Sequence, residues 1–199
     1  MNTRRLIGAG AVIAIAAGAA LVAGSLSSST PPAAAGSGGG STGGQPAATS
    51  AGTVPRCRTS NLEIWLGVGP GGAAAGSSYM PIEFTNTGSS TCALDGYPGV
   101  SARSSSQLGS AAGRDARVAG RTVKLAPGAT AHSVLQMVDV ANYPPATCGP
   151  TTASALRVYP PGSFGSEDVA YRFPACSKQG PVYLQVTAVE PGVGVPGGQ

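Results

Sequence analysis

Apolar and polar side chains alternate with a period of two along much of this chain, and this pattern constrains its fold more than any other feature. In 62–68 the even-numbered residues are apolar, and the alternation recurs in 79–87. No stretch of about eleven residues keeps a helical period without an internal glycine or proline. Because a period of two places one face of a segment against a core, these segments are predicted to be strands.

Further segments of the same character follow along the chain: 100–103, 122–125, 129–138, 155–159, 169–173 and 182–189. Turn residues separate them, including Asp95-Gly96 and Pro127-Gly128. Short strands at this spacing predict an all-β fold, namely an immunoglobulin-like antiparallel β-sandwich of about seven or eight strands.

The four cysteines all fall in the strand-rich region, and four cysteines allow three pairings. Cys57 and Cys92 are almost equidistant from the turn near residue 74, whereas Cys148 and Cys176 are equidistant from Gly162. Folding each hairpin would bring its own two cysteines together. We therefore predict two hairpin-closing disulfides, Cys57–Cys92 and Cys148–Cys176.

Residues 1–24 have the parts of an export signal. Arg4 and Arg5 precede an apolar run over 6–23, and small residues follow at Gly24 and Ser25. Because about 18 apolar residues are near the lower limit for a membrane span, an uncleaved signal anchor through 6–23 is an alternative to a cleaved signal peptide. A lipid anchor would require a cysteine where Ser25 stands, so no lipoprotein is expected.

Composition divides the rest of the 199 residues. Segment 25–55 contains no aromatic or charged residue and predicts a disordered stalk. Segment 56–190 is expected to be the sandwich domain, and 191–199 a flexible tail. Without Arg4 and Arg5 the chain keeps 10 of its 12 basic residues against 8 acidic ones, a net charge of +2. This small excess argues against nucleic-acid binding.

Two groups of residues are candidate binding surfaces. Trp65 is predicted to lie across a hairpin from Glu83 with Tyr79 nearby, which would form a platform for a sugar ring or a partner's side chain. The alternative, which the sequence favours, makes Trp65 the central packing residue of the core. The second group is basic and would suit an anionic polymer, unless it is only a solvated loop. Its members are Arg103, Arg114, Arg117, Arg121 and Lys124.

No catalytic or metal-binding pattern is recognisable. His132 is the only histidine, and no G-x-S-x-G motif accompanies it. Met80, Met137 and His132 offer soft copper ligands, but the methionines fall on the apolar phase of their strands, where core packing explains them better. We therefore expect no enzyme activity, no cofactor and no metal site.

A combination of short motifs in this chain resembles a known family. The motifs are Phe84-Thr85-Asn86-Thr87-Gly88, then 92–100 with its Gly96-Tyr97-Pro98-Gly99, then Leu125-Ala126-Pro127-Gly128, and finally Cys148 and Cys176. Over residues 57–190 they are similar to the actinobacterial exported-protein family called domain of unknown function 4232. The resemblance implies a disulfide-bonded domain of the cell envelope and carries no catalytic residues with it.

From these features we expect an exported, non-catalytic module of the cell envelope. Its partner would be an envelope polymer or another exported protein. The alternative is a structural or accessory subunit of an envelope complex, and an enzyme is the least expected of the three.

Overall fold

The structure is a computed structural model that describes residues 53–67, 72–74, 76–117 and 119–194. The predicted signal segment 1–24 and most of the predicted stalk 25–55 lie outside these ranges, so the predictions for them stay predictions. Within the described part of the chain, no helix has the length and apolar character needed to span a membrane.

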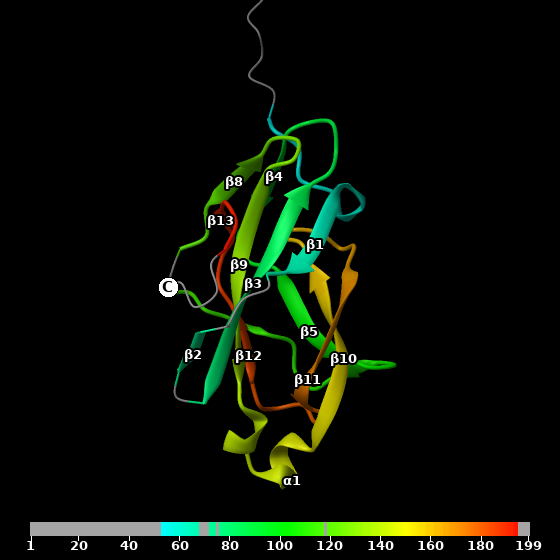
Figure 1. Ribbon diagram of the computed structural model, residues 1–199, viewed down its shortest axis with the longest axis vertical. Helices are drawn as coiled ribbons and strands as arrows, with labels where there is room; N and C mark the ends of the chain where they lie inside the picture. The colour runs from blue at the N-terminus through cyan, green and yellow to red at the C-terminus, as the bar shows by residue number, and fades with distance from the viewer. Residues whose placement is uncertain (1–52, 68–71, 75, 118, 195–199) are drawn as a thin grey trace, which may run out of the picture. The chain divides into compact units, whose positions relative to one another are not determined.

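The larger of two main sheets contains the strands that carry the candidate site (Figure 1). Strand β3 (Ser77–Asn86) pairs with β1 (Leu62–Leu66) on one side and β9 (Thr130–Val138) on the other. Strand β12 (Leu184–Val186) continues the sheet from β9 to β7 (Gly113–Arg114). The short strands β13 (Glu190–Pro191) and β2 (Gly72–Ala74) pair with β9 and β3.

The second sheet has the strand order β11, β10, β5 and β6, and a separate pair is formed by β4 and β8. Their bounds are Glu167–Cys176, Pro150–Tyr159, Gly99–Arg103, Gln107–Leu108, Cys92–Asp95 and Thr122–Leu125. Helical turns are confined to η1 (Thr59–Asn61), η2 (Val140–Asn142) and α1 (Pro145–Cys148) in the described ranges. The predicted all-β sandwich is confirmed. The strands are more numerous than predicted because strands of two or three residues leave no periodic signal.

The core lies between the inner faces of the sheets. Along β9, Ala131, Ser133, Leu135 and Met137 are buried, and the residues between them are half-buried on the outer face. Phe84 and Ile82 on β3 are fully buried. Burial of side chains of this size contributes roughly 1.5–3 kcal/mol each. The alternation in the sequence therefore predicted the inner face correctly.

Both predicted disulfides are present. Cys57 pairs with Cys92 at a Cα separation of 4.8 Å, and Cys148 pairs with Cys176 at 4.6 Å. No cysteine is left free in the described part of the chain. Structural disulfides of this kind persist in oxidising compartments, so they indicate an extracytoplasmic location.

The described fold continues past residue 190, the predicted end of the domain, as far as residue 194. Pro191 pairs with Ala131 as part of β13, and the Gly192 amide donates to the Thr130 carbonyl at 2.9 Å. The Gly194 amide donates to the carboxylate of Glu83, also at 2.9 Å. The glycine-rich composition concealed these contacts, since they use backbone groups that any residue possesses.

Candidate functional site

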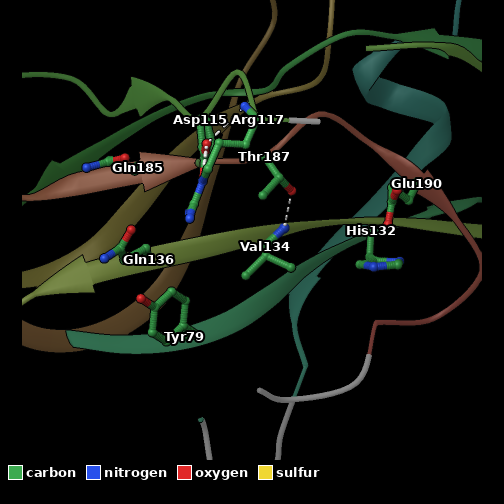
Figure 2. A pocket seen from close by; sticks show the side chains of 10 residues that line it. Tyr79, Asp115, Arg117, His132, Val134, Gln136, Gln185, Thr187 and Glu190 are labelled. Carbon is green, nitrogen blue, oxygen red and sulfur yellow. Dashed lines mark hydrogen bonds and ion pairs between the residues drawn. The ribbon is translucent and has the colours of Figure 1, made fainter. Parts of the chain in front are cut away.

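A hollow of about 290 Å³ lies on the outer face of the larger sheet. Figure 2 shows side chains from several strands and loops arranged around it. Its lining consists of Tyr79, Asp115, Arg117, His132, Val134, Gln136, Gln185, Val186, Thr187 and Glu190. The residues come from β3, β9, β12, β13 and the segments next to them, so only the tertiary structure assembles them.

One side of the hollow is a row of planar polar groups. Tyr79 on β3 and Gln185 on β12 are both cross-strand neighbours of Gln136 on β9. The Gln136 amide donates to the Ser77 hydroxyl at 3.1 Å, which orients it. Outward-facing amides and a phenol at neighbouring positions supply both donors and acceptors beside an aromatic ring.

The floor between this row and His132 is formed by Val134 and Thr187. The Val134 amide donates to the Thr187 hydroxyl oxygen at 2.9 Å, and that hydroxyl donates to the Ala188 carbonyl at 3.1 Å. Thr187 is therefore engaged as both acceptor and donor. Both hydrogen bonds hold its side chain in the floor of the hollow.

The rim of the hollow carries one ion pair. Arg117 Nε lies 2.9 Å from both carboxylate oxygens of Asp115. This hydrogen bond lowers the pKa of Asp115 below its ordinary value. Because the guanidinium is largely neutralised by its neighbour, the hollow presents no net positive charge to a ligand.

The opposite end of the hollow is formed by His132 and Glu190, which are cross-strand neighbours. His132 Nδ1 lies 3.0 Å from the Gly192 carbonyl oxygen. A carbonyl can only accept, so Nδ1 carries the hydrogen and the imidazole is held by the chain after β13. His132 is half-buried on the outer face, since its neighbours Ala131 and Ser133 on β9 are buried in the core.

Glu83 stands next to the hollow but is sealed from solvent, with none of its surface exposed. Its Oε1 accepts the Gly194 amide, and its Oε2 has no hydrogen-bond partner. Burial raises the pKa of this carboxyl, although the Gly194 hydrogen bond and the charge of His132 act in the other direction. The predicted register opposite Trp65 is confirmed. Its carboxylate is not part of an open platform beside Trp65, because the chain at Gly194 lies over it.

Trp65 lies half-buried on the outer face of edge strand β1, opposite the buried Leu62 and Ile64. Its Nε1 hydrogen donates to the Thr85 hydroxyl at 3.4 Å. The favoured interpretation of Trp65 as the central core residue is therefore wrong. The alternation already placed it on the outer face, and an edge strand gives that face only partial cover.

The predicted basic group is not one surface. Arg103 lies on the second sheet and pairs with Asp168 at 2.9 Å. The guanidinium of Arg114 lies 5.7 Å from the ring centroid of Tyr97. With Arg117 paired to Asp115, each of these three arginines has a local partner, while Arg121 and Lys124 are exposed at β8.

The metal ligands weighed in the sequence are separated by the fold. Met137 is buried in the core, Met80 packs against it, and His132 faces outward. Across the described residues, no cluster of three or more His, Cys, Asp or Glu side chains has the arrangement of a metal site.

Several lining residues were missed from the sequence, namely Asp115, Gln136, Gln185, Thr187 and Glu190. Gln136 could have been found, because the alternation of 129–138 points it outward. Gln185 and Thr187 lie in the predicted strand 182–189, where they alternate with the buried Leu184 and Val186. Asp115 and Glu190 lie in or next to strands of two residues, which leave no periodic signal.

Comparison with known proteins gives one match. A family model described as Domain of unknown function (DUF4232) matches residues 57–190. No curated protein matches the chain, and no solved structure does. The matched range contains both disulfides and every residue that lines the hollow.

Proposed function

The chain belongs to this family, whose function is unknown, and we propose that its folded unit is an exported, non-catalytic module that binds a neutral, hydroxyl-rich polymer of the cell envelope. The hollow on the outer face of the larger sheet is its ligand site. The observation that carries the proposal is the row of Tyr79, Gln136 and Gln185 beside an apolar floor.

The chemistry of this row suits a carbohydrate chain. A sugar ring presents C–H groups that pack on an aromatic face and hydroxyls that need both donors and acceptors. The hollow offers a phenol ring, two amides and Val134 for these purposes. Its Arg117 is paired with Asp115, so an anionic polymer would find little uncompensated positive charge.

The hydrogen bonds of the polar groups support binding without catalysis. Hydrolysis by a nucleophile requires a hydroxyl held by a free base. Thr187 carries the aliphatic hydroxyl of the lining, and this hydroxyl already donates to the Ala188 carbonyl rather than to a base. We propose that the hollow holds its ligand without transforming it.

The location fits the same proposal. The export signal over 1–24 would deliver the chain across a membrane, where the disulfides form. The module would then be secreted, or held by an uncleaved segment 6–23 on the stalk 25–55, without a lipid anchor. In either form the hollow would meet polymers outside the cytoplasm.

A second candidate is docking on another exported protein, as an accessory subunit. Phe164, in the turn between β10 and β11, is fully exposed. An exposed aromatic side chain of this kind is a common anchor of protein interfaces. It lies outside the residues that line the hollow, so the two functions can be tested separately.

The test is co-sedimentation of residues 48–199, which form one compact unit, with insoluble bacterial cell-wall material. We expect binding that persists in high salt and falls about tenfold in Tyr79→Ala or Gln136→Ala, the effect of losing one or two hydrogen bonds. Gln107→Ala, on exposed strand β6 of the other sheet, is the matched control.

The outcomes separate the alternatives. Binding that vanishes in salt would instead indicate an anionic polymer and the exposed cations. Failure to bind wall material, with cross-links to an envelope protein that disappear in Phe164→Ala, would replace the proposal by the accessory-subunit function.

A further inference from the structure

Residues 192–194 form a strap across the outer face of the larger sheet. Its backbone makes three hydrogen bonds to that face. The Gly192 amide donates to Thr130, the Gly192 carbonyl accepts from His132 Nδ1, and the Gly194 amide donates to Glu83 Oε1. Two of these three bonds end on ionisable side chains that would otherwise face solvent beside the hollow.

The strap fits its seat only because residue 194 has no side chain. A β-carbon on Gly194 would lie 2.5 Å from Pro81 Cβ and 2.8 Å from His132 Cδ2. Carbon atoms closer than about 3 Å overlap, so a side chain does not fit at this position. The backbone itself fills the space. Val193, in contrast, directs its side chain outward and is 63% exposed.

The carboxylate under the strap is only half used. One oxygen of Glu83 accepts the Gly194 amide, and the other has no partner although the residue is fully buried. Buried polar atoms are nearly always paired, because an unpaired one loses its hydration without compensation. A carboxylate can accept two parallel hydrogen bonds, and the strap supplies one.

The surroundings of this carboxylate resemble a binding subsite. Trp65, Glu83 and His132 are cross-strand neighbours on β1, β3 and β9. His132 also lines the hollow, so the row continues the hollow across the sheet. A tryptophan ring beside an acceptor for two hydroxyls is the arrangement expected for stacking a sugar with adjacent hydroxyl groups.

We propose that the strap occupies the place of a ligand, and that its release opens a second subsite for a sugar with two adjacent hydroxyls. This subsite is formed by Trp65, Glu83 and His132. The ligand class rests on the function proposed above, whereas the release of the strap does not. In the closed state a backbone N–H holds the place of one hydroxyl. In the open state both oxygens of Glu83 accept from the ligand.

The test uses residues 48–199 with Gly194→Leu, whose side chain cannot enter the seat, and a second form that ends at Pro191. Val193→Leu is the matched control, because it adds bulk on the exposed side of the strap. Hydrogen–deuterium exchange should show faster exchange around Thr130 and Glu83 in both opened forms and no change in the control.

Binding to insoluble bacterial cell-wall material is then measured. We expect the opened forms to bind about tenfold more tightly than the closed protein, as two new hydrogen bonds allow, and Glu83→Gln in the opened form to remove the gain. Binding by the opened forms alone would also support the proposal.

Other results overturn it. Equal affinity of open and closed forms, with Tyr79→Ala still reducing binding, would reject the second subsite and leave the hollow as the site. Absence of binding by every form would reject the proposed function and the subsite together. Unchanged exchange in both opened forms would show that residues 192–194 do not cover Glu83.

Discussion

Two acidic side chains on the outer faces of the two sheets have opposite surroundings. Asp168 on β11 is partly exposed and accepts hydrogen bonds from two arginines, with Arg103 Nε and Arg157 Nε each 2.9 Å from it. Glu83 on β3 is fully buried and accepts one backbone amide. The pKa of Asp168 is lowered, first by its hydrogen bond to Arg157, whereas burial raises the pKa of Glu83.

The difference shows which of the two faces has its carboxylate oxygens paired within the protein. Around Asp168 each carboxylate oxygen has an arginine as partner, so that face stabilises the sheet and leaves no carboxylate oxygen unpaired for a ligand. Around Glu83 a buried carboxyl has one oxygen without a partner, and burial disfavours its charged form. Groups of this kind are typical of functional sites, where they serve binding rather than stability.

The largest expected effect tests how much the Asp168 face depends on its hairpin. Replacing Cys148 and Cys176 by serine frees a loop with a sequence separation of 28 residues. The unfolding free energy should fall by about 3.5 kcal/mol in the chain-entropy account. Chemical denaturation would measure it. A loss that also weakened binding at the hollow by a similar factor would contradict the independence of the two faces.

A smaller effect in the opposite direction, a gain in stability, is expected for Glu83→Gln. The folded-state pKa of Glu83 is raised, so its contribution to stability is present below the ordinary glutamate pKa and is lost as pH rises through the folded value. The substitution should therefore raise the free energy of unfolding at neutral pH by roughly 1 kcal/mol, because it removes a buried ionisable group. The melting temperature should rise with it.

The measurement is the difference in melting temperature between Glu83→Gln and the unchanged protein from about pH 4, near the ordinary glutamate pKa, up to about pH 8, because the raised pKa of Glu83 lies above its ordinary value. The difference should grow with pH and then level off. The charged or titratable neighbours on the same face are His132, Glu190 and Glu63. Glu167→Gln, on the exposed end of β11, is the control and should show no such trend.

The smallest effect is expected for Asp168→Asn. The pKa of Asp168 is lowered, so its stabilisation is present above the ordinary aspartate pKa and is lost as pH falls through the folded value. Because the three side chains are partly exposed to solvent, the melting temperature at neutral pH should fall by only about two degrees or less. Stabilisation by this substitution would mean that the two faces do not differ as described.

How much of the site could be predicted from the sequence differs from strand to strand. For β9, the alternation alone places His132 and Gln136 outward and Leu135 inward. The strand predicted over 182–189 contains β12, whereas β13 was not predicted, since Glu190 was placed at the end of the domain and Pro191 in a tail. Those strands are two or three residues long, and their pairing with β9 depends on where the chain returns in space.

By itself the sequence determined the all-β architecture, the inward faces of the long strands and both disulfides. The strands follow from the period of the side chains, and the disulfides follow from the nearly equal distances of two cysteines from a turn. Both can be derived from the sequence. The tertiary structure alone decided that Trp65 is only half-buried, that Glu83 is sealed and that the hollow exists. Each depends on which distant segment packs over a face, and at Gly194 that segment uses only its backbone.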